Sequence, residues 1–86
     1  MKETEKILKA LANRRRLAIV KFLNNRNEAT VGEISSNIKL SFRATSKHLS
    51  ILFNVNILDK EQRSIQMYYQ LSNDIPKLAH QIINLV

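Results

Sequence analysis

The sequence predicts a mainly α-helical domain that carries one small β-hairpin. Hydrophobic residues recur at helical spacing through most of the 86 residues, and the period changes to two between residues 58 and 71. The chain also holds a single glycine, which is too few for a sheet-rich fold with many tight turns. Residues 1–86 are therefore expected to form one domain with the element order α-α-α-α-β-β-α.

The first two helices are predicted in the N-terminal quarter of the chain. The hydrophobic side chains within residues 7–11 have the spacing of a short amphipathic helix over about residues 3–12. Asn13 is placed to cap a second helix, in which residues 17–23 are apolar at every position except Lys21. A helix this apolar is expected to pack against neighbours on most of its sides.

A helix-turn-helix is predicted in the middle of the chain. Thr30 and Glu33 have the spacing of a capping box, which starts a third helix over about residues 31–38. After a turn of two residues, Ser41 is a suitable N-cap for a fourth helix over about residues 42–54. A short helix, a brief turn and a second capped helix form the helix-turn-helix pattern.

A hairpin and a last helix follow. The alternation within residues 65–71 predicts a half-buried strand with the inward side chains Ile65, Met67, Tyr69 and Leu71. Residues 58–62 would pair with it through a turn near residues 62–64. The last helix is expected over about residues 75–86, with Pro76 in its first turn. A hairpin in this position is a wing, so the predicted fold is a winged helix-turn-helix.

Composition excludes several classes of protein. The 14 Lys and Arg exceed the 7 Asp and Glu, and the absence of Cys rules out disulfides and thiolate metal sites. Two histidines and scattered carboxylates supply no nucleophile–base pair, so we predict neither an enzyme nor a bound cofactor. The first residues do not resemble a signal peptide and no apolar stretch approaches membrane-spanning length, so a cytoplasmic protein is expected. The excess positive charge favours nucleic acid as a partner.

The outer face of the fourth helix is the main candidate site. It carries a polar stripe at positions i, i+3, i+4 and i+7, formed by Arg43, Ser46, Lys47 and Ser50. Recognition helices meet the DNA major groove with their N-terminal part, where Arg and Lys bond guanine. Such a stripe is more often a solvated helix face, but the helix-turn-helix before it and the wing after it favour DNA readout.

Further side chains are expected on the DNA backbone. Three arginines open the second helix against its dipole, which favours phosphate contact for some of them, while Arg16 is expected to be structural. Basic residues on the hairpin would reach phosphates or a minor groove, although hairpin tips are often charged because they are solvated. His48 is expected either to pack or to contact a phosphate. The predicted backbone contacts are Arg14, Arg15, Ser41, His48, Ser50, Lys60 and Arg63.

Several short motifs resemble those of one family. The matching positions are 8–13, 16–19, 33–34, 40–41, 46–49, 52 and 68–71, of which Ser-x-His-Leu at 46–49 and Tyr-Tyr-x-Leu at 68–71 are the most specific. With them the chain resembles the ArsR/SmtB-type winged-helix repressors over about residues 7–72.

The resemblance implies a homodimer that binds an operator of two similar half-sites and is released by a ligand. The helices over about residues 3–12 and 75–86 would form the dimer interface, through Ile7, Leu11, Ile75, Leu78, Ala79, Ile82 and Val86. The base-contacting positions of the family fall on Phe42, Arg43, Ser46 and Lys47. Phe42 replaces a usual polar residue, so it is expected to touch a thymine methyl or a deoxyribose.

The sequence departs from the family at its metal sites and at two turns. Residues 30–32 are Thr-Val-Gly where the family has the metal-sensing Cys-Val-Cys, and the last helix offers only Asp74 and His80 toward the alternative site. No metal is therefore predicted. Lys39 and Ser64 stand where glycine is usual, so a positive φ there would cost about 1 kcal/mol.

Two functions are compatible with these features. The favoured one is a sequence-specific DNA-binding transcriptional regulator, most simply a repressor. The alternative is a winged-helix module that mainly binds protein, or that coats nucleic acid without sequence preference.

Overall fold

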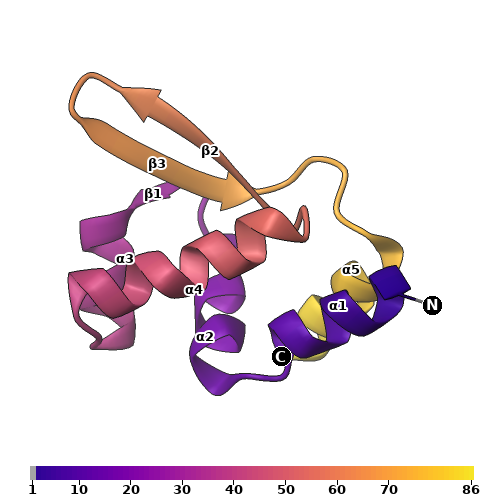
Figure 1. Cartoon of the computed structure of the whole chain (residues 1–86). Coiled ribbons are helices and arrows are strands. Elements are labelled where there is room, and N and C mark those ends of the chain that lie inside the picture. The colour runs from indigo at the N-terminus through magenta and orange to yellow at the C-terminus, as the bar shows by residue number, and fades with distance from the viewer. Residues whose placement is uncertain (1) are drawn as a thin grey trace.

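The computed structural model describes residues 2–86, which form five helices and three short strands (Figure 1). The elements in chain order are α1 (Lys2–Leu11), α2 (Arg14–Asn24), β1 (Ala29–Thr30), α3 (Val31–Ile38), α4 (Phe42–Asn54), β2 (Leu58–Arg63), β3 (Gln66–Leu71) and α5 (Lys77–Leu85). Helices α3 and α4 are the helix-turn-helix, and β2 and β3 are the wing. The predicted winged helix-turn-helix fold is confirmed, with the short strand β1 in addition.

The terminal helices and the tip of the wing lie at opposite ends of the molecule. Helices α1 and α5 pack against each other at one end, and the tip of the β2–β3 hairpin projects at the other (Figure 1). Helix α4 crosses the space between them and contacts α2, α3 and β2. The start of α4 and the tip of the wing therefore lie apart from the terminal helices (Figure 1).

Side-chain caps start the central helices where the sequence predicts them. The Asn13 side chain accepts hydrogen bonds from the backbone N–H groups of Arg15 and Arg16 at the start of α2, at 2.9 and 3.1 Å. The Thr30 hydroxyl accepts from the Glu33 backbone N–H at 3.2 Å, and the Glu33 carboxylate accepts from the Thr30 backbone N–H at 2.9 Å, completing the capping box of α3. These bonds satisfy donors that would otherwise be left without partners at the helix ends.

The core is built around α2 and α4. Ile19 and Val20 of α2 are fully buried, as expected for a helix with so few polar positions. The inner face of α4 is also buried through Thr45, Leu49 and Leu52. This burial turns the polar stripe of α4 outward.

Strand β1 extends the hairpin to a three-stranded antiparallel sheet of order β1-β3-β2. Ala29 pairs with Tyr69 and Thr30 pairs with Tyr68, which fixes the start of α3 to the middle strand of the sheet. Sequence analysis did not predict β1, because a strand of two residues has no period. Tyr69 is buried, as the alternation of the strand predicts.

The hairpin turn lies one residue later than predicted. Arg63 pairs with Gln66, so the turn consists of Ser64 and Ile65. The prediction that Ile65 belongs to the inner face of the strand is therefore wrong, and its side chain is 93% exposed. The pattern misled because Ile65 continues the alternation of the strand without being paired in it.

The last helix is shorter than predicted. Pro76 has φ −52° and ψ 138°, so its backbone is extended and α5 begins at Lys77. Ile75 accordingly lies before the helix. The first helix also begins and ends one residue earlier than expected, at Lys2 and Leu11.

Three residues other than glycine adopt positive φ, within the part of the chain that the structure describes. They are Lys39 at 56°, Asn56 at 64° and Ser64 at 58°. Lys39 is the left-handed C-cap of α3 and Ser64 opens the hairpin turn. Both turns thus keep the conformation that suits glycine, at an energetic cost to the side chains present.

Candidate nucleic-acid interface

The predicted stripe lies on the outer face of α4. Arg43, Lys47 and Ser50 are exposed and Ser46 is half-buried, on the side opposite the buried Leu49. Neither Arg43 nor Lys47 forms an ion pair with another of residues 2–86. Two free cations and two hydroxyls therefore lie along one face of α4, with Arg43, Ser46 and Lys47 in its N-terminal half, an arrangement suited to base edges in a major groove.

The first residues of this helix add a hydroxyl and an aromatic ring. The Ser41 hydroxyl accepts from the Ala44 backbone N–H at 3.1 Å, which leaves its own proton free to be donated. Phe42 follows, with 62% of its surface exposed. The start of α4 thus offers a donor for a phosphate beside an apolar surface.

The three arginines of α2 have different environments. Arg14 is exposed, while one Nη1 donor of Arg15 lies 3.4 Å from the Ile38 carbonyl at the end of α3. Arg16 donates to the carbonyls of Ala10 and Lys9 at the end of α1, the latter at 3.2 Å. The structural role predicted for Arg16 is confirmed, and Arg14 is the most accessible of the three charges.

His48 is held on the inner side of the interface by Arg16. Its Nδ1 lies 3.1 Å from Nη1 of Arg16, so Nδ1 accepts and the ring proton is on Nε2. Burial, followed by the charges of Arg16 and Arg15, lowers the pKa of His48 from its usual value of 6.5. The ring therefore packs against Arg16, and its Nε2 remains for the predicted phosphate contact.

Arg63 of the wing is already occupied by carboxylates. It forms a two-bond ion pair with Glu28, with Nη2–Oε1 at 2.8 Å, and its Nη2 also lies 2.7 Å from Oε1 of Glu61. Its guanidinium lies 4.6 Å from the centre of the Tyr68 ring. The hydrogen bonds that Arg63 donates to Glu28 and then to Glu61 raise the pKa of Arg63, and the bond that Glu28 accepts lowers the pKa of Glu28. In this structure the charge of Arg63 is neutralised within the molecule, so its phosphate contact stays a prediction that requires these ion pairs to open.

Lys60 is the other basic residue of the wing. Its amino group lies 4.4 Å from the centre of the Phe53 ring, in a cation–π contact between β2 and α4. Lys60 remains exposed, so a phosphate could replace the ring as its partner.

Comparison of the chain with known protein families and relatives agrees with this geometry. A family model described as "Bacterial regulatory protein, arsR family" matches residues 13–60. The transcriptional activator HlyU of Vibrio cholerae is 36% identical over 78 residues, which cover 91% of this chain and 71% of HlyU. The chain belongs to the ArsR family. The ArsR/SmtB resemblance of the sequence is confirmed.

Other relatives have the same fold or a related sequence. The solved structure of HlyU from Vibrio cholerae has a TM-score of 0.83 at 35% identity, covering 96% of this chain and 86% of HlyU. The arsenical resistance operon repressor of Bacillus subtilis is 30% identical over 74 residues, covering 86% of this chain and 70% of the repressor. A homodimeric winged helix-turn-helix DNA-binding domain from Mycobacterium bovis shares the fold, with a TM-score of 0.83 at 23% identity, covering 98% of this chain and 74% of the domain. This ArsR-family chain is a DNA-binding transcriptional regulator, and its homologues are regulators rather than enzymes.

The residues predicted to form the ArsR-type dimer interface divide into two groups. Ile7, Leu11 and Ala79 are buried within the single subunit, so they have almost no surface left for a second one. The predicted residues that keep exposed surface are Ile75, Leu78, Ile82 and Val86. Sequence analysis left out Leu8 and Leu85, which are 47% and 85% exposed on α1 and α5. The apolar side chains that α1 and α5 expose are therefore only partly those predicted, since Leu8 and Leu85 are exposed and Ile7 and Leu11 are not.

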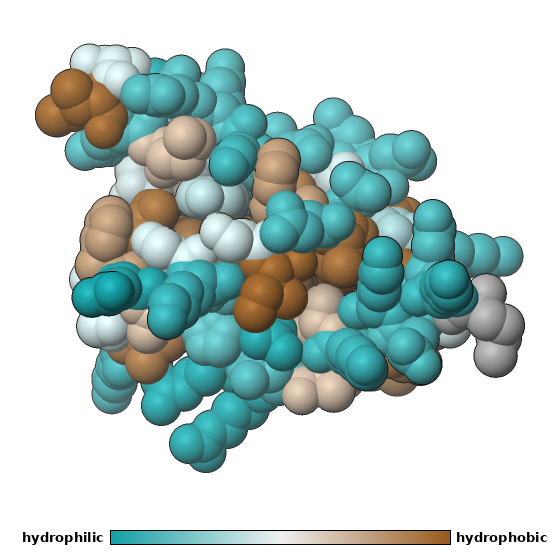
Figure 2. Space-filling view, viewed as in Figure 1, coloured by the Kyte–Doolittle hydropathy of each residue, from teal (hydrophilic) through white to brown (hydrophobic). Residues whose placement is uncertain are grey.

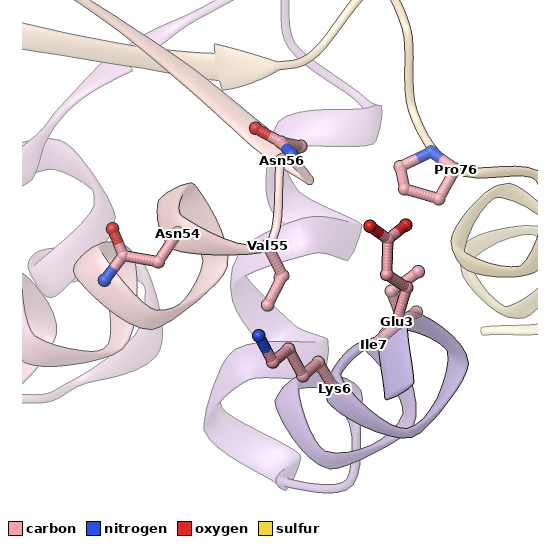
Figure 3. Close-up of a pocket in the computed structure, with 7 residues that line it drawn as sticks. All are labelled: Glu3, Lys6, Ile7, Asn54, Val55, Asn56 and Pro76. Carbon is pink, nitrogen blue, oxygen red and sulfur yellow. The ribbon is translucent and has the colours of Figure 1, made fainter. Parts of the chain in front are cut away.

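A hollow of about 140 Å³ separates α1 from the end of α4 and the start of α5 (Figure 3). Figure 3 shows the Lys6 amino group directed toward Val55 and the Glu3 carboxylate directed toward Pro76. Its lining has one acid, one base and two amides, without a histidine or a nucleophile. This set does not supply the groups of an acyl- or phosphoryl-transfer site.

The family's metal positions are otherwise engaged. The Thr30 hydroxyl belongs to the capping box, and Nδ1 of His80 lies 3.1 Å from the Asn84 amide. Among residues 2–86 no three His, Cys, Asp or Glu side chains gather closely enough to hold a metal ion. Over the same residues no helix has the length and apolar character needed to cross a membrane.

Two residues of the interface were not predicted. Glu28 is in a loop 35 residues before its partner Arg63, and no sequence signal links the two. Ile65 was assigned to the inner face of the strand, and only the register of the hairpin places it in the turn at the tip.

Proposed function

We propose that this ArsR-family regulator binds an operator of two similar half-sites as a homodimer, with α4 in the major groove and the β2–β3 hairpin on the flanking DNA. Arg43, Ser46 and Lys47 read base edges, with Phe42 against a thymine methyl or sugar. The phosphate contacts come from Arg14, Arg15 and Lys60, with the hydroxyls of Ser41 and Ser50 and with Nε2 of His48.

The unpaired charges of α4 carry this proposal. Three other cations near this face are engaged within the molecule: Arg16 by carbonyls, Arg63 by two carboxylates and Lys60 by an aromatic ring. Arg43 and Lys47 have no such partner among residues 2–86. Free cations at adjacent positions of one helix face suit bidentate contacts with guanine.

The exposed apolar side chains of α1 and α5 support the homodimer. Leu8 and Leu85 lie on the two helices that pack together at the end of the molecule away from the wing tip, and Val86 directly follows α5 (Figure 1). A second copy that covers this surface leaves both α4 stripes facing outward. The Mycobacterium bovis domain with the same fold is homodimeric, which supports the same assembly here.

Repression is the simplest effect of such a dimer, because a bound operator excludes other proteins from the same DNA. HlyU of Vibrio cholerae is an activator and the Bacillus subtilis relative is a repressor. The position of the operator relative to the promoter then decides the direction of regulation.

Selection of bound fragments from random DNA tests the proposal. Wild-type protein should enrich paired half-sites and keep a footprint on them at about 0.2 M salt, where nonspecific binding has weakened strongly. Arg43→Ala should relax specificity at one base of each half-site, at a cost of about 1–3 kcal/mol.

Lys77→Ala is the matched control, since it removes one exposed cation from α5 and should leave the selected site unchanged. Enrichment of no sequence by the wild type would favour a protein-binding or nonspecific module instead. Identical selection by wild type and Arg43→Ala would remove α4 as the reading element.

A further inference from the structure

The wing carries no net charge. Between residues 58 and 71 two acids balance two bases. Arg63 is paired with Glu28 and Glu61, and Lys60 lies over the Phe53 ring. Electrostatic attraction to phosphates is therefore weak at the tip of the hairpin, so a contact that the tip makes with DNA has another physical basis.

The tip of this neutral hairpin is an isoleucine. Two-residue hairpin turns usually hold Gly, Asn or Asp, but here Ser64 is followed by Ile65, whose side chain is 93% exposed. The far end of the hairpin is the hydrophobic projection at the upper left of Figure 2. The ion pairs of Arg63, directly before the turn, hold the base of this tip to the loop that contains Glu28.

Ile65 faces a hollow that it shares with the recognition helix. Ile65 and Phe42 both line this space of about 330 Å³, together with Val31 and Met67. Phe42 is the first residue of α4 and is 62% exposed. The two most exposed apolar side chains outside the terminal helices therefore stand on opposite elements of the interface, with an open apolar space between them.

We propose that Ile65 and Phe42 form an apolar clamp on the DNA strand that passes between the recognition helix and the wing, with Ile65 against the sugar edges of the minor groove. This inference rests on the proposed function, because it needs α4 in the adjacent major groove. Apolar side chains such as Ile and Phe contact DNA through sugars, methyl groups and the edges of base steps, without phosphate charge. An isoleucine has no donor or acceptor, so the wing reads the shape of the flanking DNA rather than its hydrogen-bond pattern.

The experiment measures affinity for the selected site at several salt concentrations, with the full chain. Ile65→Ser should weaken binding about five- to tenfold, the effect of losing part of one buried side chain. The salt dependence should stay unchanged, because an apolar contact releases no counterions. Phe42→Ser should behave in the same way.

Ile65→Lys tests whether the tip reaches DNA at all. A lysine at a tip that touches DNA neutralises a phosphate, so log K should fall more steeply with log salt by about 0.9 per subunit, or about 2 per dimer. Ser64→Ala, in the same turn, is the matched control and should bind like the wild type. All of these positions are exposed, so the thermal unfolding of each variant should match that of the wild type.

The outcomes separate the clamp from the proposed function. If the wild type selects a site and Arg43→Ala relaxes it, but Ile65→Ser binds as tightly as the wild type, the clamp is wrong and the proposed function stands. A changed salt dependence in Ile65→Ser would also overturn it, since the contact would then be electrostatic. If the wild type selects no site, the proposed function fails first.

Discussion

The guanidinium of Arg16 connects three helices. It belongs to α2, donates to the carbonyls of Lys9 and Ala10 at the end of α1, and contacts His48 on α4. The sequence shows three adjacent arginines and predicts a structural role for Arg16, and the packing shows which groups Arg16 holds. The same contact makes the half-buried His48 a link between α1 and α4.

This environment of His48 predicts a pH dependence of stability. Burial and the charges of Arg16 and Arg15 lower its pKa in the folded protein, whereas the unfolded chain keeps the usual value of 6.5. As the pH falls below about 6.5, the unfolded state binds the proton first, so the free energy of unfolding should decrease toward the lowered folded pKa. The pKa values of Glu28 and Glu33 are lowered from 4.5, so these carboxylates stay charged over the same range.

Urea unfolding between pH 7.5 and 5.5 measures this effect. The wild type should lose stability across the range, and His48→Gln should lose much less. His80→Gln removes the exposed histidine of α5 and should keep the wild-type dependence. Equal slopes for the wild type and His48→Gln would contradict the assignment.

At the scale of elements, the turn of the helix-turn-helix carries a measurable strain. Lys39 ends α3 with φ 56° and ψ 50°, and the next backbone N–H, of Leu40, bonds the Ser35 carbonyl at 3.1 Å. The left-handed conformation costs a residue with a side chain about 1–2 kcal/mol. Glycine avoids this cost, but it loses more conformational entropy on folding, which offsets about half of the gain.

Lys39→Gly is therefore expected to stabilise the domain by about 0.5–1 kcal/mol, which raises the melting temperature by about 2–8 °C. Thermal unfolding followed by circular dichroism measures the change. Lys39→Ala removes the same charge but keeps the strained φ, so it should give no comparable gain. A gain of equal size in both variants would assign the effect to the charge.

The elements also show which signals in the sequence were reliable. The caps at Asn13, Thr30 and Ser41 were predicted correctly, because each depends on residues three or fewer positions apart. The start of α5 and the hairpin turn were misplaced by one or two residues. At both places an apolar residue, Ile75 or Ile65, continued the pattern of an element to which it does not belong.

At the scale of the whole molecule, the subunit keeps apolar surface that one chain does not cover. Leu8 is 47% and Leu85 is 85% exposed on the paired helices α1 and α5. Burying a leucine stabilises an association by about 1.5–3 kcal/mol. In a homodimer through these helices, Leu85→Glu should therefore weaken self-association at least about tenfold per side chain.

Sedimentation over a range of micromolar concentrations measures the change, and circular dichroism should show an unchanged fold because Leu85 is exposed in the subunit. Ile65→Ser, an equally exposed apolar position on the wing, should dimerise like the wild type. A wild type that stays monomeric at these concentrations would remove the model of paired half-sites.

The sequence by itself determined the order of the helices and of the two hairpin strands, the caps of the central helices, the inward face of α4 and the polar stripe on its outer face. These features depend on residues within one or two turns of each other, so their spacing along the chain is sufficient to find them. The tertiary structure decided which charges remain free. It pairs Arg63 with Glu28 from 35 residues earlier, ties Arg16 to α1, and leaves Arg43 exposed. It also divides the apolar residues of the terminal helices between the subunit core and the outer surface, because burial depends on neighbours that only the folded chain brings together.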